Sequence, residues 1–279
     1  MKKQNKIIEG LRETPVDNRD FQVGALFRLP SIAELPDNFE LTGYRIKDQK
    51  DTDYCSAYMA TGMSELQEDV ELWPDFNFAC SKELTGDNEE WGQNLRDALK
   101  ALTKYGSVPQ SEAVEVKKPR YLSSYPERLK DIAVKYKKQT FLNVKPTAGM
   151  DAFDTIRSTI WHFRNEKRAV GFGVVFGWNL DDKIIDTIPD SGFGHALYTV
   201  GWKNIDDKPY LIVVQSAGNS AGDNGVHYFS REVINHYVAR YQAYMIVDMP
   251  REDVEYMLEK GIKVGDNWII QFLKLIFKL

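Results

Sequence analysis

The periodicity of apolar residues changes near Arg168, and this change constrains the fold more than any other feature of the chain. Before Arg168 the apolar residues recur at helical spacing and predict helices over residues 51–72, 93–105 and 151–164. After it they alternate with smaller residues, as strands do. The expected strands cover residues 170–176, 195–202, 210–215, 225–229 and 243–247. Helices followed by strands favour an α+β protein in which a helical lobe faces a β lobe.

The length and the residue pattern suggest one domain with two lobes and an extension at each end. A chain of 279 residues is ample for such a domain. Residues 1–34 carry scattered Pro, Asp and Arg and are expected to be an extended lead-in. The compact domain is predicted over residues 35–250, with a helical lobe at about 50–125 and a β lobe at about 126–250. Residues 251–279 form a C-terminal extension.

Charge and cysteine content narrow the classes of function and the compartment. The net charge of −5 and the pI of about 5.5 give no basic surface for nucleic acid. Two cysteines cannot form a disulfide framework, and the N-terminus has no apolar run of signal-peptide length. The chain is therefore predicted to fold in reducing cytoplasm. We expect no cofactor and no metal.

Cys55 is the first candidate for chemistry because it stands at the start of the helix predicted over residues 51–72. Asp51, Thr52 and Asp53 are cap-type residues, and the helix N-terminus favours a thiolate, the reactive form of cysteine. The alternative is a small buried apolar side chain, which is the usual role of a free cysteine. Cys80 lies inside an apolar helical patch, and packing is the better interpretation there.

A thiolate nucleophile needs a base, and the chain offers four histidines. His162 stands between two aromatic residues on a predicted helix, which favours packing, and no role is assigned to His227 or His236. His195 follows a run of small residues and begins a strand, so a substrate could approach it closely. A buried structural histidine remains the alternative at that position.

Gln49 stands six residues before Cys55. Its amide could donate a hydrogen bond to a developing oxyanion together with the Cys55 backbone amide. Taken alone, it would be an ordinary loop glutamine.

Three blocks of this sequence resemble the papain family of cysteine peptidases. The first block is Gln49 with Cys55 and the pair Ala57-Tyr58 that follows it. The second block is Gly194-His195-Ala196 followed by Val200-Gly201-Trp202, and the third runs from Gln215 to Gly225, ending in Asp-Asn-Gly. The blocks occur in the family's order over about residues 10–250. Residues 15–21 and 95–106 are similar to bacterial members, so the chain resembles bacterial or phage-type peptidases most.

The resemblance implies a fold and a chemistry. It implies a helical lobe and an antiparallel, barrel-like β lobe with the active site in the cleft between them. Cys55 would be the nucleophile, His195 the general base, Gln49 an oxyanion donor, and Gln215 the residue that orients His195. The implied enzyme is an endopeptidase that forms a thioester acyl-enzyme with peptide or protein substrates.

The resemblance also suggests a place for the substrate. Gly92 stands near the position where the family offers glycine backbone to an extended substrate. Gly194 and Ala196 leave room beside His195, which favours an apolar substrate side chain next to the cleaved bond. No long inhibitory propeptide is expected, since the compact part is predicted to begin near residue 35.

Several positions depart from the family pattern. The family's orienting Asn is Gln215, and the Trp that shields it is Ala217. Thr52 replaces a disulfide cysteine, and Lys50 and Ser56 replace the Gly and Trp beside the oxyanion Gln and the nucleophile. Two alternatives to a peptidase follow. One is a catalytically impaired protein that binds peptides or has a structural role, and the other is an acyltransferase or amidase that uses the same Cys–His pair.

The C-terminal segment 268–279 lies beyond the resemblance and is strongly apolar. On a helix, Gln271, Lys274 and Lys278 would form one narrow polar stripe. The segment is too short to cross a bilayer. It could pack on the body of the protein, mediate self-association, or lie on a membrane surface. We expect docking to a partner or to a second copy.

Overall fold

The computed structural model describes residues 10–147 and 149–264, and it contains eight α-helices and eight strands within these ranges. The helices are α1 Val23–Leu26, α2 Cys55–Glu68, α3 Pro74–Thr85, α4 Leu95–Lys104, α5 Arg128–Ala133, α6 Ala152–His162, α7 Arg231–Tyr241 and α8 Arg251–Glu259. The strands are β1 Phe39–Glu40, β2 Thr140–Asn143, β3 Val170–Phe176, β4 Ile184–Ile185, β5 Phe193–Ile205, β6 Lys208–Val214, β7 Val226–Phe229 and β8 Ala243–Val247.

The predicted helices and strands are confirmed, with shifts of a few residues at their ends. The helices predicted over residues 51–72, 93–105 and 151–164 correspond to α2, α4 and α6. The side chains of Asn94 and Asp151 cap α4 and α6 by accepting from the amides of Asp97 and Asp154.

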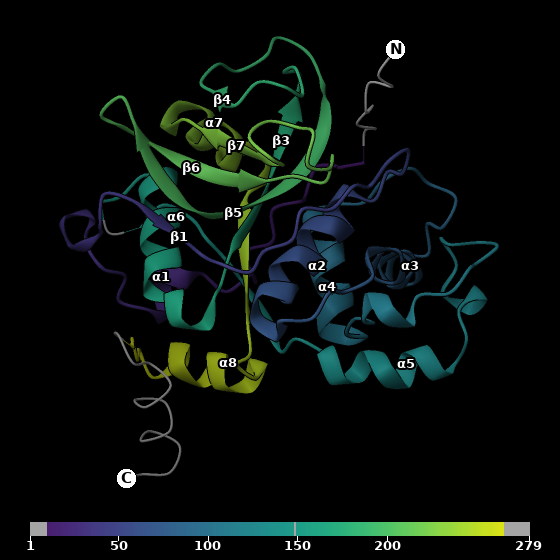
Figure 1. Ribbon diagram of the computed structural model, residues 1–279. Coiled ribbons are helices and arrows are strands. Elements are labelled where there is room, and N and C mark those ends of the chain that lie inside the picture. The colour runs from purple at the N-terminus through teal and green to yellow at the C-terminus, as the bar shows by residue number, and fades with distance from the viewer. Residues whose placement is uncertain (1–9, 148, 265–279) are drawn as a thin grey trace.

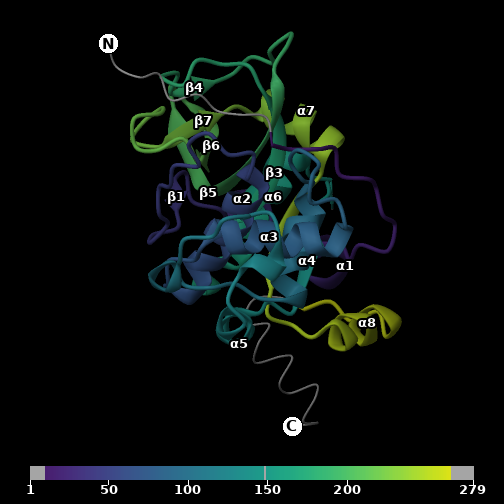
Figure 2. The same cartoon turned by 90° about the vertical axis from the view of Figure 1, so that its right-hand side faces the viewer.

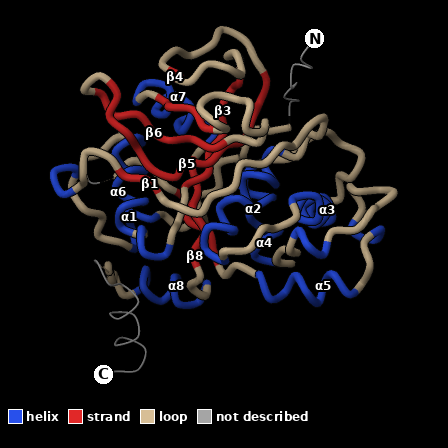
Figure 3. The backbone as a smooth tube through the Cα atoms, in the orientation of Figure 1, coloured by secondary structure: helices blue, strands red, loops and turns tan. Residues whose placement is uncertain are grey.

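The helices and strands form two regions of the molecule. In Figure 1 the helices α2, α3, α4 and α5 gather on the right, and the sheet rises on the left and at the top. Figure 2, turned by 90°, places these helices in front of the sheet, and Figure 3 shows the two classes of structure in separate colours. The α+β class and the helical region beside a β region are therefore confirmed.

All eight strands belong to one sheet, which is not closed. Its order is β2-β8-β3-β5-β6-β7-β4, and β1 pairs with β5 at the side of this path. Neighbouring strands are antiparallel except β4 and β7, which are parallel. The expected antiparallel β lobe is confirmed, but its sheet stays open, because the edge strands β2 and β4 have four and two residues and do not pair with each other in the described chain.

Helix α2 fixes the position of Cys55 because it packs against the long strand β5. Met59 and Met63 lie against Gly171 of β3, and Gly62 lies against the Tyr198 ring of β5. A Cβ at Gly62 would lie 2.7 Å from that ring, so a larger residue would push the helix away from the sheet.

The start of α2 differs from the prediction in one respect. Its N-cap residue is Tyr54, with no side-chain cap, whereas Asp51 to Asp53 were the expected cap residues. The buried Asp53 instead joins two other segments, since it accepts from the Gly92 amide and pairs with Arg120 at 2.8 Å.

The lead-in is more firmly packed than the sequence suggests. Leu11, Val23, Leu26 and Phe27 are buried in the main core, so the compact part does not begin near residue 35. The periodicity gives little warning, because α1 is only four residues long and the rest of the lead-in is irregular.

No described helix is both long enough and apolar enough to span a bilayer. The apolar segment 268–279 lies outside the described residues.

Candidate active site

Cys55 is the first residue of α2 and is completely buried. Its sulfur accepts from the backbone amide of Ala196 in β5, so it lies at the contact between the helical region and the sheet. Burial raises the pKa of the Cys55 thiol to about 12, and the hydrogen bonds from Ala196 and Ser56 offset only part of this effect. The helix N-terminus therefore does not make Cys55 a thiolate in this conformation.

His195 lies in β5, next in sequence to the residue that contacts Cys55, and is also completely buried. Its ring lies near the rings of Phe176 and Phe193, with centroid distances of 5.7 and 6.5 Å. Neither ring nitrogen has a hydrogen-bond partner among the described residues. Burial, and secondly the nearby His227, lower the pKa of His195 to about 3. The imidazole is thus neutral and forms no hydrogen bond or ion pair with Cys55 within the described chain.

Gln49 is held on the loop that leads into α2. Its side-chain Nε2 donates to the Thr52 carbonyl at 2.7 Å, and its Oε1 accepts from the Ser216 hydroxyl at 2.5 Å. A primary amide has two N–H hydrogens, so one of them is still available for an oxyanion. Ser216 was not singled out from the sequence, although it directly follows Gln215 in the third block.

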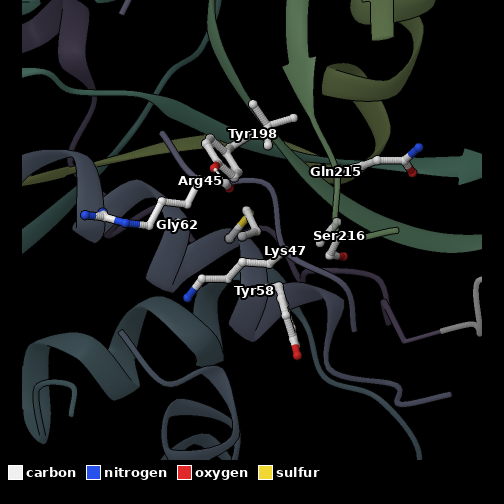
Figure 4. A pocket seen from close by; sticks show the side chains of 10 residues that line it. Arg45, Lys47, Tyr58, Gly62, Tyr198, Gln215 and Ser216 are labelled. Atoms are coloured by element: carbon white, nitrogen blue, oxygen red, sulfur yellow. Dashed lines mark hydrogen bonds between the residues drawn. The ribbon is translucent and has the colours of Figure 1, made fainter. Parts of the chain in front are cut away.

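Gln215 does not contact His195 as the resemblance implies. It follows β6, is 3% exposed, and makes a short hydrogen bond between its Nε2 and Nε2 of His227 in β7. Its Oε1 is buried and has no partner in the described chain. Figure 4 shows the Gln215 amide turned away from Tyr198 and Lys47. No role was assigned to His227 from the sequence. The only feature that could have pointed to one was its place in the short strand predicted over residues 225–229.

The predicted substrate-binding residues lie beside a space that residues 10–12 of the chain itself fill, and we call this space the cleft. Gly194 accepts from the amides of Gly10 and Leu11 at 3.3 and 3.1 Å through its carbonyl oxygen. Gly92 adopts a φ of +62°, and a Cβ there would collide with the Gly10 carbonyl. Ala196 contacts Cys55 through its amide, as described above.

Gly10, Leu11 and Arg12 form an extended segment across this cleft. The amide of Gln93 donates to the Gly10 carbonyl at 2.9 Å, and the amide of Arg12 donates to the Gln93 carbonyl at 3.1 Å, so the segment runs parallel to the chain at Gln93. A Cβ at Gly10 would lie 2.9 Å from the Cys55 sulfur. We call residues 10–12 the covering segment. It shields Cys55 from solvent, a role that was not predicted for the extended lead-in.

The Leu11 side chain anchors the covering segment. It is 4% exposed and belongs to the main core. A Cβ at Gly173 would collide with the side chains of Leu11 and Tyr241. Leu11 therefore fills the space between Gly173 and Tyr241. Arg12 adds ion pairs with Asp87 and Glu90 on the loop before Gly92.

A small pocket lies between α2 and the ends of β5 and β6 (Figure 4). Its volume is about 10 Å³, which is room for about one water. Lys47 lines it and forms an ion pair with Glu65, a carboxylate buried in α2. The pocket is lined by Arg45, Lys47, Tyr58, Met59, Gly62, Ala196, Tyr198, Val214, Gln215 and Ser216. It is too small for a peptide side chain in this conformation.

The described residues contain no group of three or more His, Cys, Asp or Glu side chains placed to hold a metal ion.

Known structures share this architecture. Xylellain, a cysteine protease from Xylella fastidiosa, is 19% identical and has a TM-score of 0.69, over 89% of this chain and 99% of its own. Procathepsin L 3 from the larval midgut of Tenebrio molitor has a TM-score of 0.60 at 15% identity, over 82% of this chain and 76% of its own. This chain has a papain-like fold.

Bromelain from Ananas comosus, in complex with the E64 inhibitor, also has the papain-like fold, with a TM-score of 0.60 at 13% identity. The similarity covers 77% of this chain and all of bromelain. No family model and no curated protein matches the sequence. The papain-like fold explains why a helix that begins at Cys55 meets a strand that carries His195.

Proposed function

We propose that this protein is a cysteine peptidase that hydrolyses peptide bonds with Cys55 and His195. The observation that carries the proposal is the covering segment. A stretch of extended chain already lies over the Cys55 sulfur and makes backbone hydrogen bonds to Gln93 and Gly194. A cleft that binds peptide backbone directly above a thiol at a helix N-terminus suits a peptidase.

The proposed chemistry is acyl transfer through a thioester. The Cys55 proton passes to His195, and the thiolate attacks the carbonyl carbon of the substrate. The second N–H of Gln49 and the Cys55 amide would stabilise the oxyanion. His195 then gives the proton to the leaving amine and afterwards activates the water that hydrolyses the thioester.

The covering segment has to leave the cleft before a substrate enters. Its departure would also hydrate Cys55 and His195, which lowers the pKa of the thiol and raises that of the imidazole toward their usual ranges. Both changes favour the charged pair that the chemistry needs. Because Leu11 fills the space between Gly173 and Tyr241, an apolar substrate side chain of similar size should fit there.

Digestion of a peptide library tests the proposal. The wild type and Cys80→Ala, in which only the packed cysteine is changed, should release the same fragments. Cys55→Ala should release none and retain the same melting temperature. Cleavage by Cys55→Ala at the wild-type rate would exclude Cys55 as the nucleophile.

The structure also favours a second candidate, a papain-fold protein that binds peptides without cleaving them. The supporting observation is that Gln215 is engaged by His227 while His195 has no polar partner in the described chain. Peptide binding without release of fragments would support this candidate. Release of the acyl group to an added amine in preference to water would support an acyltransferase.

A further inference from the structure

His195, Gln215 and His227 lie on one face of the central sheet. Thr199 of β5 pairs with Val213 of β6, and Val213 pairs with His227 of β7. His195 lies four residues before Thr199, and Gln215 lies two residues after Val213, so both positions keep the same face. Cross-strand diagonal neighbours on one face are within reach of long side chains. The proximity of His227 also lowers the pKa of His195 through electrostatic repulsion.

The hydrogen bonds of His227 define its tautomer. Its Nδ1 lies 2.6 Å from the Asp182 carbonyl oxygen, which can only accept, so Nδ1 carries a hydrogen. Burial lowers the pKa of His227, which keeps the ring neutral. In a neutral ring with a protonated Nδ1, Nε2 is an acceptor.

The tautomer of His227 in turn orients the Gln215 amide. Since Nε2 of His227 accepts, Gln215 must present its N–H₂ group to it, and its Oε1 is left without a partner. A buried carbonyl oxygen without a hydrogen bond costs stability, so such a group in a folded protein calls for a functional explanation. The two buried ring nitrogens of His195 likewise have no partner among the described residues.

The sheet makes room for the His227 ring. Gly222 has a φ of +55°, and a Cβ there would collide with the Val226 carbonyl oxygen and lie 2.9 Å from Cε1 of His227. A side chain at residue 222 would therefore displace the ring from Gln215.

We propose that His227 is a positioning residue which holds the Gln215 amide so that its Oε1 accepts the ring N–H of His195 in the active conformation. His227 then acts on catalysis through Gln215 and does not touch the substrate. Gln215 would fix the tautomer of His195, as an orienting partner must for a general base. The inference rests on the proposed peptidase function.

Steady-state kinetics of His227→Leu and His227→Gln test the proposal, with Ile212→Ala as the control. Ile212 is buried in the neighbouring strand β6 on the opposite face, so its truncation lowers stability without touching Gln215. His227→Leu should lower kcat about tenfold or more with little change in KM, because the base loses its fixed tautomer. His227→Gln can still accept from Gln215 and should recover part of the loss.

A spectroscopic measurement separates positioning from loss of stability. The measurement uses protein labelled with ¹⁵N-histidine and alkylated at Cys55, because a group on this sulfur displaces Gly10 and keeps the covering segment away. The ring nitrogen shifts of His195 should then report one tautomer with His227 in place and a mixture in His227→Leu. Ile212→Ala should retain the wild-type shifts. Unchanged His195 shifts together with an unchanged kcat in folded His227→Leu would overturn the inference. If the wild type itself cleaves no peptide, the proposed function fails, and the ring shifts still decide whether His227 positions His195.

Discussion

Leu11→Ala should open the active site, because Leu11 is the apolar anchor of the covering segment. The side chain is 4% exposed and is packed between Gly173 and Tyr241. Truncating a buried Leu costs about 2–5 kcal/mol, and the lower end applies here because the segment lies at the edge of a cleft. The substitution destabilises only the closed state, since Leu11 leaves its buried site when the segment opens.

A cost of about 2 kcal/mol corresponds to an increase of about 30-fold in the open population, because each 1.4 kcal/mol is a factor of ten. When opening and closing are fast, the rate of Cys55 alkylation follows this population. Iodoacetamide labelling followed by peptide mapping should therefore show Cys55 labelled about 30-fold faster in Leu11→Ala than in the wild type.

Cys80 supplies the internal control for this experiment. It is buried in a separate cluster with Leu129, so it reports unfolding of the helical region and not opening of the cleft. Leu129→Ala is the matched variant and should increase the labelling of Cys80 more than that of Cys55. The reasoning is refuted if Leu11→Ala leaves Cys55 at the wild-type rate, or if it accelerates both cysteines equally.

Because burial raises the pKa of Cys55 to about 12, the covered protein should show no thiolate ultraviolet absorbance in Cys80→Ala at neutral pH, and a thiolate titration step near the usual cysteine pKa of about 8.5 would contradict this. The pKa of His195 is lowered to about 3 in the folded protein, so this histidine takes up a proton at higher pH in the unfolded chain than in the folded one. The free energy of unfolding should therefore fall as the pH drops from about 6.5 toward 3, by up to about 1.4 kcal/mol per pH unit. Thermal melts of His195→Phe should show a smaller loss over the same range. Asp53→Ala removes the partner of Arg120 and of a cleft amide, and it should lower the free energy of unfolding in urea by about 2 kcal/mol, whereas Glu112→Ala at an exposed ion pair should change it by less than about 1 kcal/mol.

The fold class was predictable because periodicity is a local property. The strands predicted over residues 170–176 and 243–247 coincide with β3 and β8, and α2 lies within residues 51–72. Sheet closure was not predictable, because it depends on whether edge strands far apart in the sequence find each other.

The sequence by itself placed Cys55 at the start of a helix, His195 in a strand and Gln49 six residues before Cys55, because spacing along the chain and helix position are local. It could not show that Leu11 of the lead-in would fill the cleft, since Leu11 contacts Gly173 and Tyr241, which folding alone brings close to it. It also could not show that Gln215 would pair with His227, although both stand in or beside predicted strands. Only the register of β6 and β7 makes them neighbours.

The protonation states of the candidate site were likewise decided by the tertiary structure. A helix N-terminus favours a thiolate, and this local effect was visible in the sequence. Complete burial beneath the covering segment opposes it more strongly, because removing water disfavours the charged forms of both Cys55 and His195. The sequence identified which residues could react, and the packing of the chain upon itself determined that they are held neutral and covered.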